Sequence, residues 1–233
     1  MPPRVSVIIP VRNCAAYLGE ALDSIWRQPG PTPEVICVDD GSTDGTRDLI
    51  EREKRIRFFK TNPEGLGPGS ARNLAISHAS GDVFAFLDGD DIWPIDKLPT
   101  QIDALKHNPD AEVIGGLTER FITPGYQPNQ PPFPANSAVY FNHHLGAFLI
   151  RRSAWERVGP FDPELRCSED QDWSYVQERI HRFRALLPDW GLRPLWQDRW
   201  RFLQQHWELE QAWQVPAVVV QRVLRNTWYR VRG

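Results

Sequence analysis

The sequence is poor in cysteine and has no long hydrophobic segment. Its three cysteines, Cys14, Cys37 and Cys167, are odd in number and far apart, which argues against a disulfide framework and favours a reducing compartment. No stretch approaches the ~20 uninterrupted apolar residues of a membrane-spanning helix. The apolar run near the N-terminus is too short for a signal peptide. We therefore expect a soluble, cytoplasmic protein.

The chain also lacks an excess of positive charge and internal repeats. Its 27 basic and 30 acidic residues give a formal net charge of −3. A nucleic-acid-binding protein normally carries a basic field, so we expect no nucleic-acid partner. A length of 233 residues suits one domain with a C-terminal extension.

Strand-like and helix-like segments alternate through the first half of the chain. Short apolar segments typical of buried strands occupy 4–10, 34–39, 56–60, 83–88 and 111–116. Helical spacing or composition occupies 14–26, 46–54, 70–80 and 95–109, with Ser70 as an expected N-cap and Gly81 as an expected helix stop. This alternation predicts an α/β fold with a mostly parallel sheet.

The composition changes twice along the chain. Residues 121–142 are rich in Pro, Asn and Gln and read as a loop or flap, after which a strand and a helix return. Six of the ten tryptophans fall between Trp190 and Trp228, and Trp196, Trp200, Leu203 and Trp207 have the spacing of one helix face. We divide the chain into 1–120, a middle part at 121–185 and a helical extension at 186–233. The extension is suited to peripheral contact with a membrane or another protein.

Two acidic clusters follow predicted strands. Asp39 and Asp40 end the second strand, and the sequence LDGDD ends the fourth. The carboxyl ends of parallel strands lie on one edge of a sheet, where ligands of such folds collect. Carboxylates this close repel one another unless a cation compensates, and Mg²⁺ and Mn²⁺ bind carboxylates together with phosphate oxygens. The pattern therefore predicts a divalent-cation site beside a phosphorylated ligand, where Gly89 would allow close backbone approach.

Several short motifs, taken together and in order, resemble those of a known protein family. PVRN, VDDGSTDGT, GSARN, LDGDD, GPFDPEL and SEDQDW occur in this order between Val5 and Val176. Together they resemble the family 2 glycosyltransferases of GT-A fold. The resemblance implies a Rossmann-like, three-layer α/β/α domain. It also implies inverting, Mn²⁺- or Mg²⁺-assisted transfer of a sugar from a nucleotide-diphosphate donor, most often a UDP-sugar. The acceptor would be the hydroxyl of a saccharide, a lipid-linked molecule or a protein, and the part at 121–185 would form the acceptor side of the domain.

The resemblance also assigns donor-binding residues. Pro10 and Val11 would border the nucleotide base, and Asp39 would accept a hydrogen bond from its ring. Gly41 and Ser42 would continue this wall. The full set implied for the nucleotide sugar is Pro10, Val11, Asp39, Gly41, Ser42, Arg72, Asp88, Gly89 and Asp91.

Arg72 and the LDGDD carboxylates would handle the diphosphate end of the donor. Arg72 would brace the nucleotide and its aspartates, and Asp88 would contact the ribose or a metal-bound phosphate. Asp90 is implied as the direct metal ligand, with Asp88 beside it. Asp91 would shape the loop or contact the donor sugar.

SEDQDW supplies the expected catalytic base. Inversion by a single displacement needs one carboxylate to deprotonate the acceptor hydroxyl. The family's base is the Asp of an ED pair, here Asp170, with Glu169 as its neighbour and Asp172 as the second candidate. The same stretch suits a helix N-terminus capped by Ser168, which is compatible with catalysis.

Other interpretations of these motifs stay open at this point. Residues Asp40 to Glu51 match a twelve-residue calcium loop, although the segment before it reads as a strand. Asp88 and Asp90 could form the nucleophile loop of a haloacid-dehalogenase-like phosphatase, and GLGPGS weakly resembles a dinucleotide loop. His143 and His144, being adjacent, are expected to face opposite ways, and His206 is a candidate for a position near the metal.

Overall fold

A six-stranded sheet forms the centre of the protein. The computed structural model describes residues 2–121, 139–140, 144–164 and 228–232. The sheet order is β3-β2-β1-β4-β8-β5. These strands span Ile56–Lys60 (β3), Glu34–Asp39 (β2), Val5–Val11 (β1), Val83–Phe86 (β4), Leu149–Arg151 (β8) and Val113–Ile114 (β5). β3, β2, β1 and β4 run parallel, and β8 is antiparallel to both β4 and β5. The predicted α/β fold with a mostly parallel sheet is confirmed.

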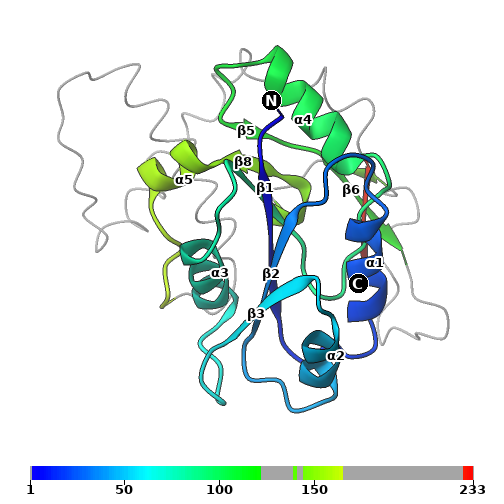
Figure 1. Cartoon of the computed structure of the whole chain (residues 1–233), viewed down its shortest axis with the longest axis vertical. Coiled ribbons are helices and arrows are strands. Elements are labelled where there is room, and N and C mark those ends of the chain that lie inside the picture. Colours follow the sequence, from blue (N-terminus) through cyan, green and yellow to red (C-terminus); the bar gives the residue numbers. More distant parts are fainter. Residues whose placement is uncertain (1, 122–138, 141–143, 165–227, 233) are drawn as a thin grey trace, which may run out of the picture.

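Helices cover both faces of the sheet (Figure 1). α1 (Leu18–Trp26) and α2 (Thr46–Arg52) lie on one side, whereas α3 (Pro68–Ser77) and α5 (Arg152–Val158) lie on the other. The chain reverses direction across the sheet after β3, because β4 pairs with the opposite side of β1. Right-handed crossovers therefore put α3 on the face opposite α1 and α2. α4 (Lys97–His107) follows β4.

The register brings the two acidic strand ends near each other. Val11 pairs with Asp39 of β2, and Ile8 pairs with Phe86 of β4. Only β1 separates the two acidic strands, so they lie about 10 Å apart at the usual strand spacing. Pro10 and Val11 are buried between them. The carboxyl ends of β1, β2 and β4 thus form one edge, as the sequence predicts.

Two arginines at the junction of β8 and α5 (Arg152–Val158) bind neighbouring backbone carbonyls. Arg151 donates from Nε to the Ala111 carbonyl at 2.7 Å and from Nη2 to the Leu105 carbonyl at 3.1 Å. Arg152 donates to the carbonyls of Gly81 and Ala79 at 2.8 and 3.0 Å. Five donors in a rigid fork suit arginine to such carbonyl pairs.

The boundaries of α3 differ from the prediction. Ser70 is not the N-cap, because the helix begins at Pro68, whose fixed φ suits the first turn. The helix ends at Ser77, so Gly81 is not its stop. A Cβ at Gly81 would lie 2.6 Å from the Ser6 nitrogen and Oγ. Close packing against β1 therefore explains this glycine.

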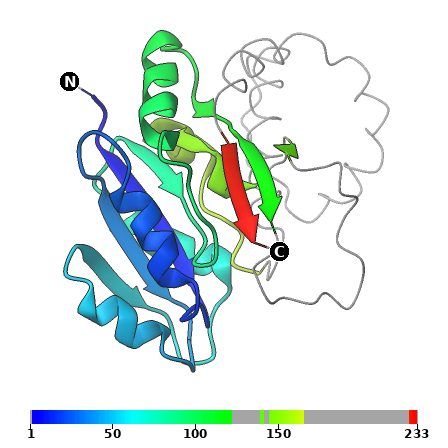
Figure 2. The ribbon, with the colours of Figure 1, turned by 90° about the vertical axis from the view of Figure 1, so that its right-hand side faces the viewer.

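A second, three-stranded sheet was not predicted. β6 (Leu117–Phe121) pairs antiparallel with β7 (Val139–Tyr140) and parallel with β9 (Trp228–Arg232). Figure 2 shows β9 beside β6. The helical prediction for the C-terminal extension is thus wrong at 228–232, where aromatic and β-branched residues favour a strand. The loop prediction for 121–142 is wrong at Phe121 and at 139–140, which belong to β6 and β7. The rest of that segment, the tryptophan stripe and His206 lie outside the described residues. In the described part, no helix combines the length and apolar character needed to cross a bilayer.

Candidate active site

The loops after β1 and β2 are joined by side-chain hydrogen bonds. Asn13 accepts from the Thr43 backbone N–H at 2.8 Å and adopts a positive φ of 54°. The Cys14 N–H donates to Thr46 Oγ1 at 2.8 Å, and the Ala15 N–H donates to Asp44 at 3.1 Å. Short polar side chains offer the backbone such local partners. The loops at this edge are therefore held in one arrangement.

Asp40 fixes the loop that precedes α3. Its carboxylate accepts from Thr61 Oγ1 at 2.6 Å, from the Leu66 N–H at 2.7 Å and from the Gly67 N–H at 2.9 Å. Asp40 is only 4% exposed. The Asp40 carboxylate is thus occupied by donors of the loop before α3. In addition, the strand β2 precedes Asp40, where a calcium loop has a helix. The calcium-loop alternative is therefore not supported. The same contacts occupy N–H groups of GLGPGS, which removes support for a dinucleotide loop.

Gly41 allows the turn between β2 and this loop. Its φ of +80° lies in the left-handed region that glycine adopts without strain. A Cβ there would stand 2.5 Å from the Pro63 carbonyl oxygen. Ser42 follows in the same turn, and its Oγ accepts from the Asn13 N–H at 3.0 Å.

Asp39 is buried beneath an arginine that the sequence did not indicate as a site residue. Its carboxylate is 0% exposed and accepts from the Ser42 N–H at 2.9 Å. Arg47, on α2, donates to its other oxygen from Nε at 3.1 Å and Nη2 at 2.8 Å. Burial alone would raise the pKa of Asp39, but the hydrogen bonds from Ser42 and Arg47 outweigh it and lower the pKa. Asp39 is therefore held as a carboxylate.

The LDGDD segment turns tightly at the end of β4. The Asp91 N–H donates to the Asp88 carbonyl at 3.1 Å. A Cβ at Gly89 would lie 2.9 Å from both Cys14 Sγ and Val11 Cγ1. Only glycine lets this turn pack so closely against the end of β1. Asp90 is exposed at the turn, whereas Asp91 is 5% exposed.

Arg72 links α3 to this turn. It is 4% exposed, and its Nη2 donates to Asp88 Oδ1 at 2.7 Å. The partial burial of Asp88 would raise its pKa, but the positive charge of Arg72, then that of His144, lowers it. The neighbouring Asn73 exchanges two hydrogen bonds, of 2.8 and 2.9 Å, with the backbone of Phe161. The GSARN and GPFDPEL motifs therefore meet, and Arg72 is set facing Asp88.

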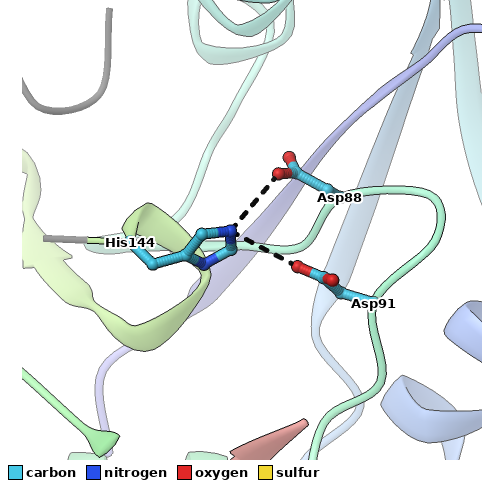
Figure 3. Close-up of side chains that lie close together, drawn as sticks. All are labelled: Asp88, Asp91 and His144. Atoms are coloured by element: carbon cyan, nitrogen blue, oxygen red, sulfur yellow. Dashed lines mark ion pairs between the residues drawn. The ribbon is translucent and has the colours of Figure 1, made fainter. Parts of the chain in front are cut away.

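His144 completes a cluster with two aspartates (Figure 3). Its Nε2 lies 3.7 Å from Asp88 Oδ2 and 3.6 Å from Asp91 Oδ2. One ligand atom from each residue lies within 4.8 Å of the others. Two carboxylates and one imidazole form a donor set suited to a divalent cation. We call Asp88, Asp91 and His144 the acidic triad.

The structure thus unites part of the predicted site. Asp88, Asp91 and Arg72 lie together beside the end of β1, the strand that carries Pro10 and Val11. The carboxylate of Asp90, the expected direct ligand, is not a member of the acidic triad. The candidate bases Asp170, Glu169 and Asp172 lie outside the described residues.

His144 and Arg47 were missed as site residues. The prediction for His144 assumed a strand, in which neighbouring side chains alternate. His144 instead caps the short helix η1 (Leu145–Ala147), so the strand argument does not apply. The sequence signal was a histidine shortly before the strand expected after residue 142.

Gly146 supports the His144 ring, and its replacement is the first testable change. A Cβ at Gly146 would lie 2.9 Å from His144 Cε1 and Nδ1. If the triad holds a divalent cation, Gly146→Ala should push the imidazole from the triad and weaken Mn²⁺ affinity about tenfold, measured by calorimetric titration. Gly19→Ala is the control, because a Cβ there meets nothing within 4 Å. Equal Mn²⁺ affinity in both variants would contradict this position for the ring.

Comparisons with known proteins identify related sequences and folds. The family described as glycosyl transferase family 2 matches residues 6–161. An uncharacterized glycosyltransferase of Haemophilus influenzae is 38% identical over 110 residues, which are 46% of this chain and 44% of that protein. A chondroitin synthase of Pasteurella multocida is 31% identical over 198 residues, 79% of this chain and 20% of that one. The chain therefore spans less than half of these relatives.

A solved structure shows the same architecture. The structure of S. aureus TarS in complex with UDP aligns with a TM-score of 0.59 and 26% identity. The alignment covers 73% of this chain and 54% of that one. The central sheet and its helices thus have an arrangement similar to that of TarS.

Proposed function

The chain belongs to glycosyl transferase family 2, and from this premise we propose that it transfers a sugar from a nucleoside-diphosphate donor to a hydroxyl acceptor. The observation that carries the proposal is the acidic triad beside Arg72 at the carboxyl edge of the sheet. A donor of this kind brings a diphosphate, whose charge needs cations. UDP is the proposed nucleotide, supported by the UDP complex of TarS.

The described residues suit a divalent cation, and we propose Mn²⁺ or Mg²⁺. Asp88 and Asp91 concentrate two negative charges, and His144 adds a nitrogen donor. We propose that the triad holds the cation and that Asp90, exposed on the same turn, faces the donor beside it. When bound, the cation would act as a Lewis acid and stabilise charge on the leaving diphosphate.

The protein's own residues have distinct proposed roles. Arg72 holds Asp88 in place and adds positive charge near the diphosphate. The loops after β1 and β2, which include Gly41 and Ser42, would border the nucleoside. We further propose inversion at the sugar, with Asp170 accepting the proton of the acceptor hydroxyl. The acceptor classes are those that the sequence suggests: saccharide, lipid-linked molecule or protein.

A thermal-shift panel tests this function. UDP-, GDP- and dTDP-sugars are added with and without Mn²⁺. A donor present at ~100 times its dissociation constant should stabilise the folded protein by about 2.7 kcal/mol. We expect the largest shift with a UDP-sugar plus Mn²⁺. A response to Ca²⁺ alone, or no response to any nucleotide sugar, would contradict the proposal.

The imidazole of the triad predicts a preference between metals. Mg²⁺ favours an all-oxygen octahedron, whereas nitrogen ligands favour transition metals. We expect Mn²⁺ to bind more tightly than Mg²⁺, and His144→Ala to reduce this preference about tenfold, both measured by calorimetry. The exposed His107 provides the control variant His107→Ala. An unchanged Mn²⁺/Mg²⁺ ratio in His144→Ala would exclude His144 as a ligand.

A further inference from the structure

Two polar residues of α4 are fully buried one helical turn apart. Lys97 and Gln101 are each 0% exposed, although lysine is rarely buried completely. Lys97 Nζ donates to Gln101 Oε1 at 2.8 Å. Burial lowers the pKa of Lys97 well below its usual value. Burying two polar side chains costs free energy unless their hydrogen bonds are satisfied. The groups that Lys97 and Gln101 contact therefore show which segments the pair fixes in place.

Gln101 connects this pair to the turn that carries His144. Its Nε2 donates to the Ala147 carbonyl at 2.9 Å. The Ala147 N–H in turn donates to the His144 carbonyl at 2.9 Å, which closes η1. Two successive hydrogen bonds thus join the side chain of Gln101 to the backbone of His144. The same Nε2 also approaches the Ile114 carbonyl of β5 at 3.4 Å.

Lys97 connects the pair to the segment that follows the LDGDD turn. Its Nζ lies 4.3 Å from the centroid of the Trp93 ring, a cation–π distance. Trp93 is 3% exposed and comes two residues after Asp91. The Trp93 N–H donates to Ser24 Oγ of α1 at 3.1 Å, and the Lys97 N–H donates to the Pro94 carbonyl at 3.2 Å. This segment is therefore fixed against two helices.

We propose that Lys97 and Gln101 are positioning residues that hold the His144 turn at its distance from Asp88 and Asp91. The two halves of the triad come from segments more than fifty residues apart in the sequence. The α4 pair contacts the neighbours of both halves. Metal sites need ligands held within a few tenths of an ångström, which such supporting contacts provide. The inference rests on the proposed function, because it assumes that the triad binds a cation.

Gln101→Leu is the test, with Mn²⁺ affinity as the readout. The substitution removes the hydrogen bond to Ala147 and should weaken Mn²⁺ binding about 10–100-fold. Calorimetric titration of Mn²⁺ is performed well below the melting temperature, so that lower stability alone does not change the measured affinity. Asn108→Ala is the control: it removes the side-chain bond to the Ala104 carbonyl at the end of α4, away from the pair.

Two further variants keep the test decisive. If Gln101→Leu fails to fold, Gln101→Glu keeps the size but replaces the amide donor and should also lose Mn²⁺ affinity. Lys97→Met keeps the volume and should weaken Mn²⁺ binding less, because Gln101 still reaches Ala147. Mn²⁺ affinity within twofold of the wild type in the folded Gln101 variants would overturn the inference, as would an equal loss in Asn108→Ala. Absence of Mn²⁺ binding to the wild type would instead refute the proposed metal site itself.

Discussion

Asp88→Asn should abolish Mn²⁺-dependent binding of UDP. Among the ion pairs of the described residues, Asp88 is the only carboxylate that contacts both Arg72, at 2.7 Å, and His144, at 3.7 Å. It also belongs to the acidic triad and to the metal ligands expected from the sequence. The neutral amide keeps the size of the side chain but removes its charge. We expect at least a hundredfold loss of UDP affinity in the presence of Mn²⁺, measured by calorimetry.

The same substitution should cost some stability. Arg72 is buried, and the substitution removes the negative charge that faces its guanidinium group. The cost is moderated because the Asp88 side chain is 33% exposed to solvent. The free energy of unfolding should therefore fall by about 1–3 kcal/mol, less than for a fully buried pair. A folded Asp88→Asn protein that binds UDP and Mn²⁺ normally would refute the role of Asp88. Asp103→Asn, at an exposed position of α4, is the control.

The two other carboxylates of the turn extend this test. Asp90→Asn and Asp91→Asn should both weaken Mn²⁺-dependent UDP binding. Because Asp90 is exposed and Asp91 is 5% exposed, only Asp91→Asn should also lower the melting temperature. Unchanged UDP binding in Asp90→Asn would remove Asp90 from the proposed site.

Asp170→Asn should stop transfer while leaving donor binding intact. A general base contributes about 10²–10⁴-fold to the rate, so UDP release from the donor in the presence of acceptor should fall by this factor. The dissociation constant of UDP with Mn²⁺ should change by less than twofold. The loss should appear in kcat, because the base acts on the acceptor in the transition state.

Neighbouring carboxylates provide controls for the base. Glu169→Gln and Asp172→Asn change the same charge within two positions of Asp170. We expect both to retain more activity than Asp170→Asn. If Asp172→Asn shows the larger loss, the base is Asp172. If Asp170→Asn transfers sugar at the wild-type rate, its assignment is wrong.

The sheet and its acidic edge were predictable because they depend on local patterns. Buried parallel strands are short apolar runs, and the Asp residues that follow them must lie at the carboxyl edge. The order of β2, β1 and β4 then brings Asp39 and Asp88 to the same edge of the sheet, with the end of β1 between them. Ser70 failed as a cap because Gly67 and Pro68 start α3 earlier.

Contacts between distant segments were not predictable from one sequence. His144 joins Asp88 only because β8 pairs with β4, which places η1 beside the LDGDD turn. Arg47 covers Asp39 because α2 turns back along β2. The burial of Lys97 and Gln101 likewise depends on how α4 packs.

The coupling between Mn²⁺ and UDP tests the central claim most directly. Mn²⁺ affinity is measured by calorimetry with and without saturating UDP, and UDP affinity with and without Mn²⁺. If the acidic triad holds the cation against the donor diphosphate, each ligand should tighten the other by the same factor, about tenfold or more. The coupling should vanish in Asp88→Asn. Independent binding of the two ligands, or coupling that persists in Asp88→Asn, would contradict the account.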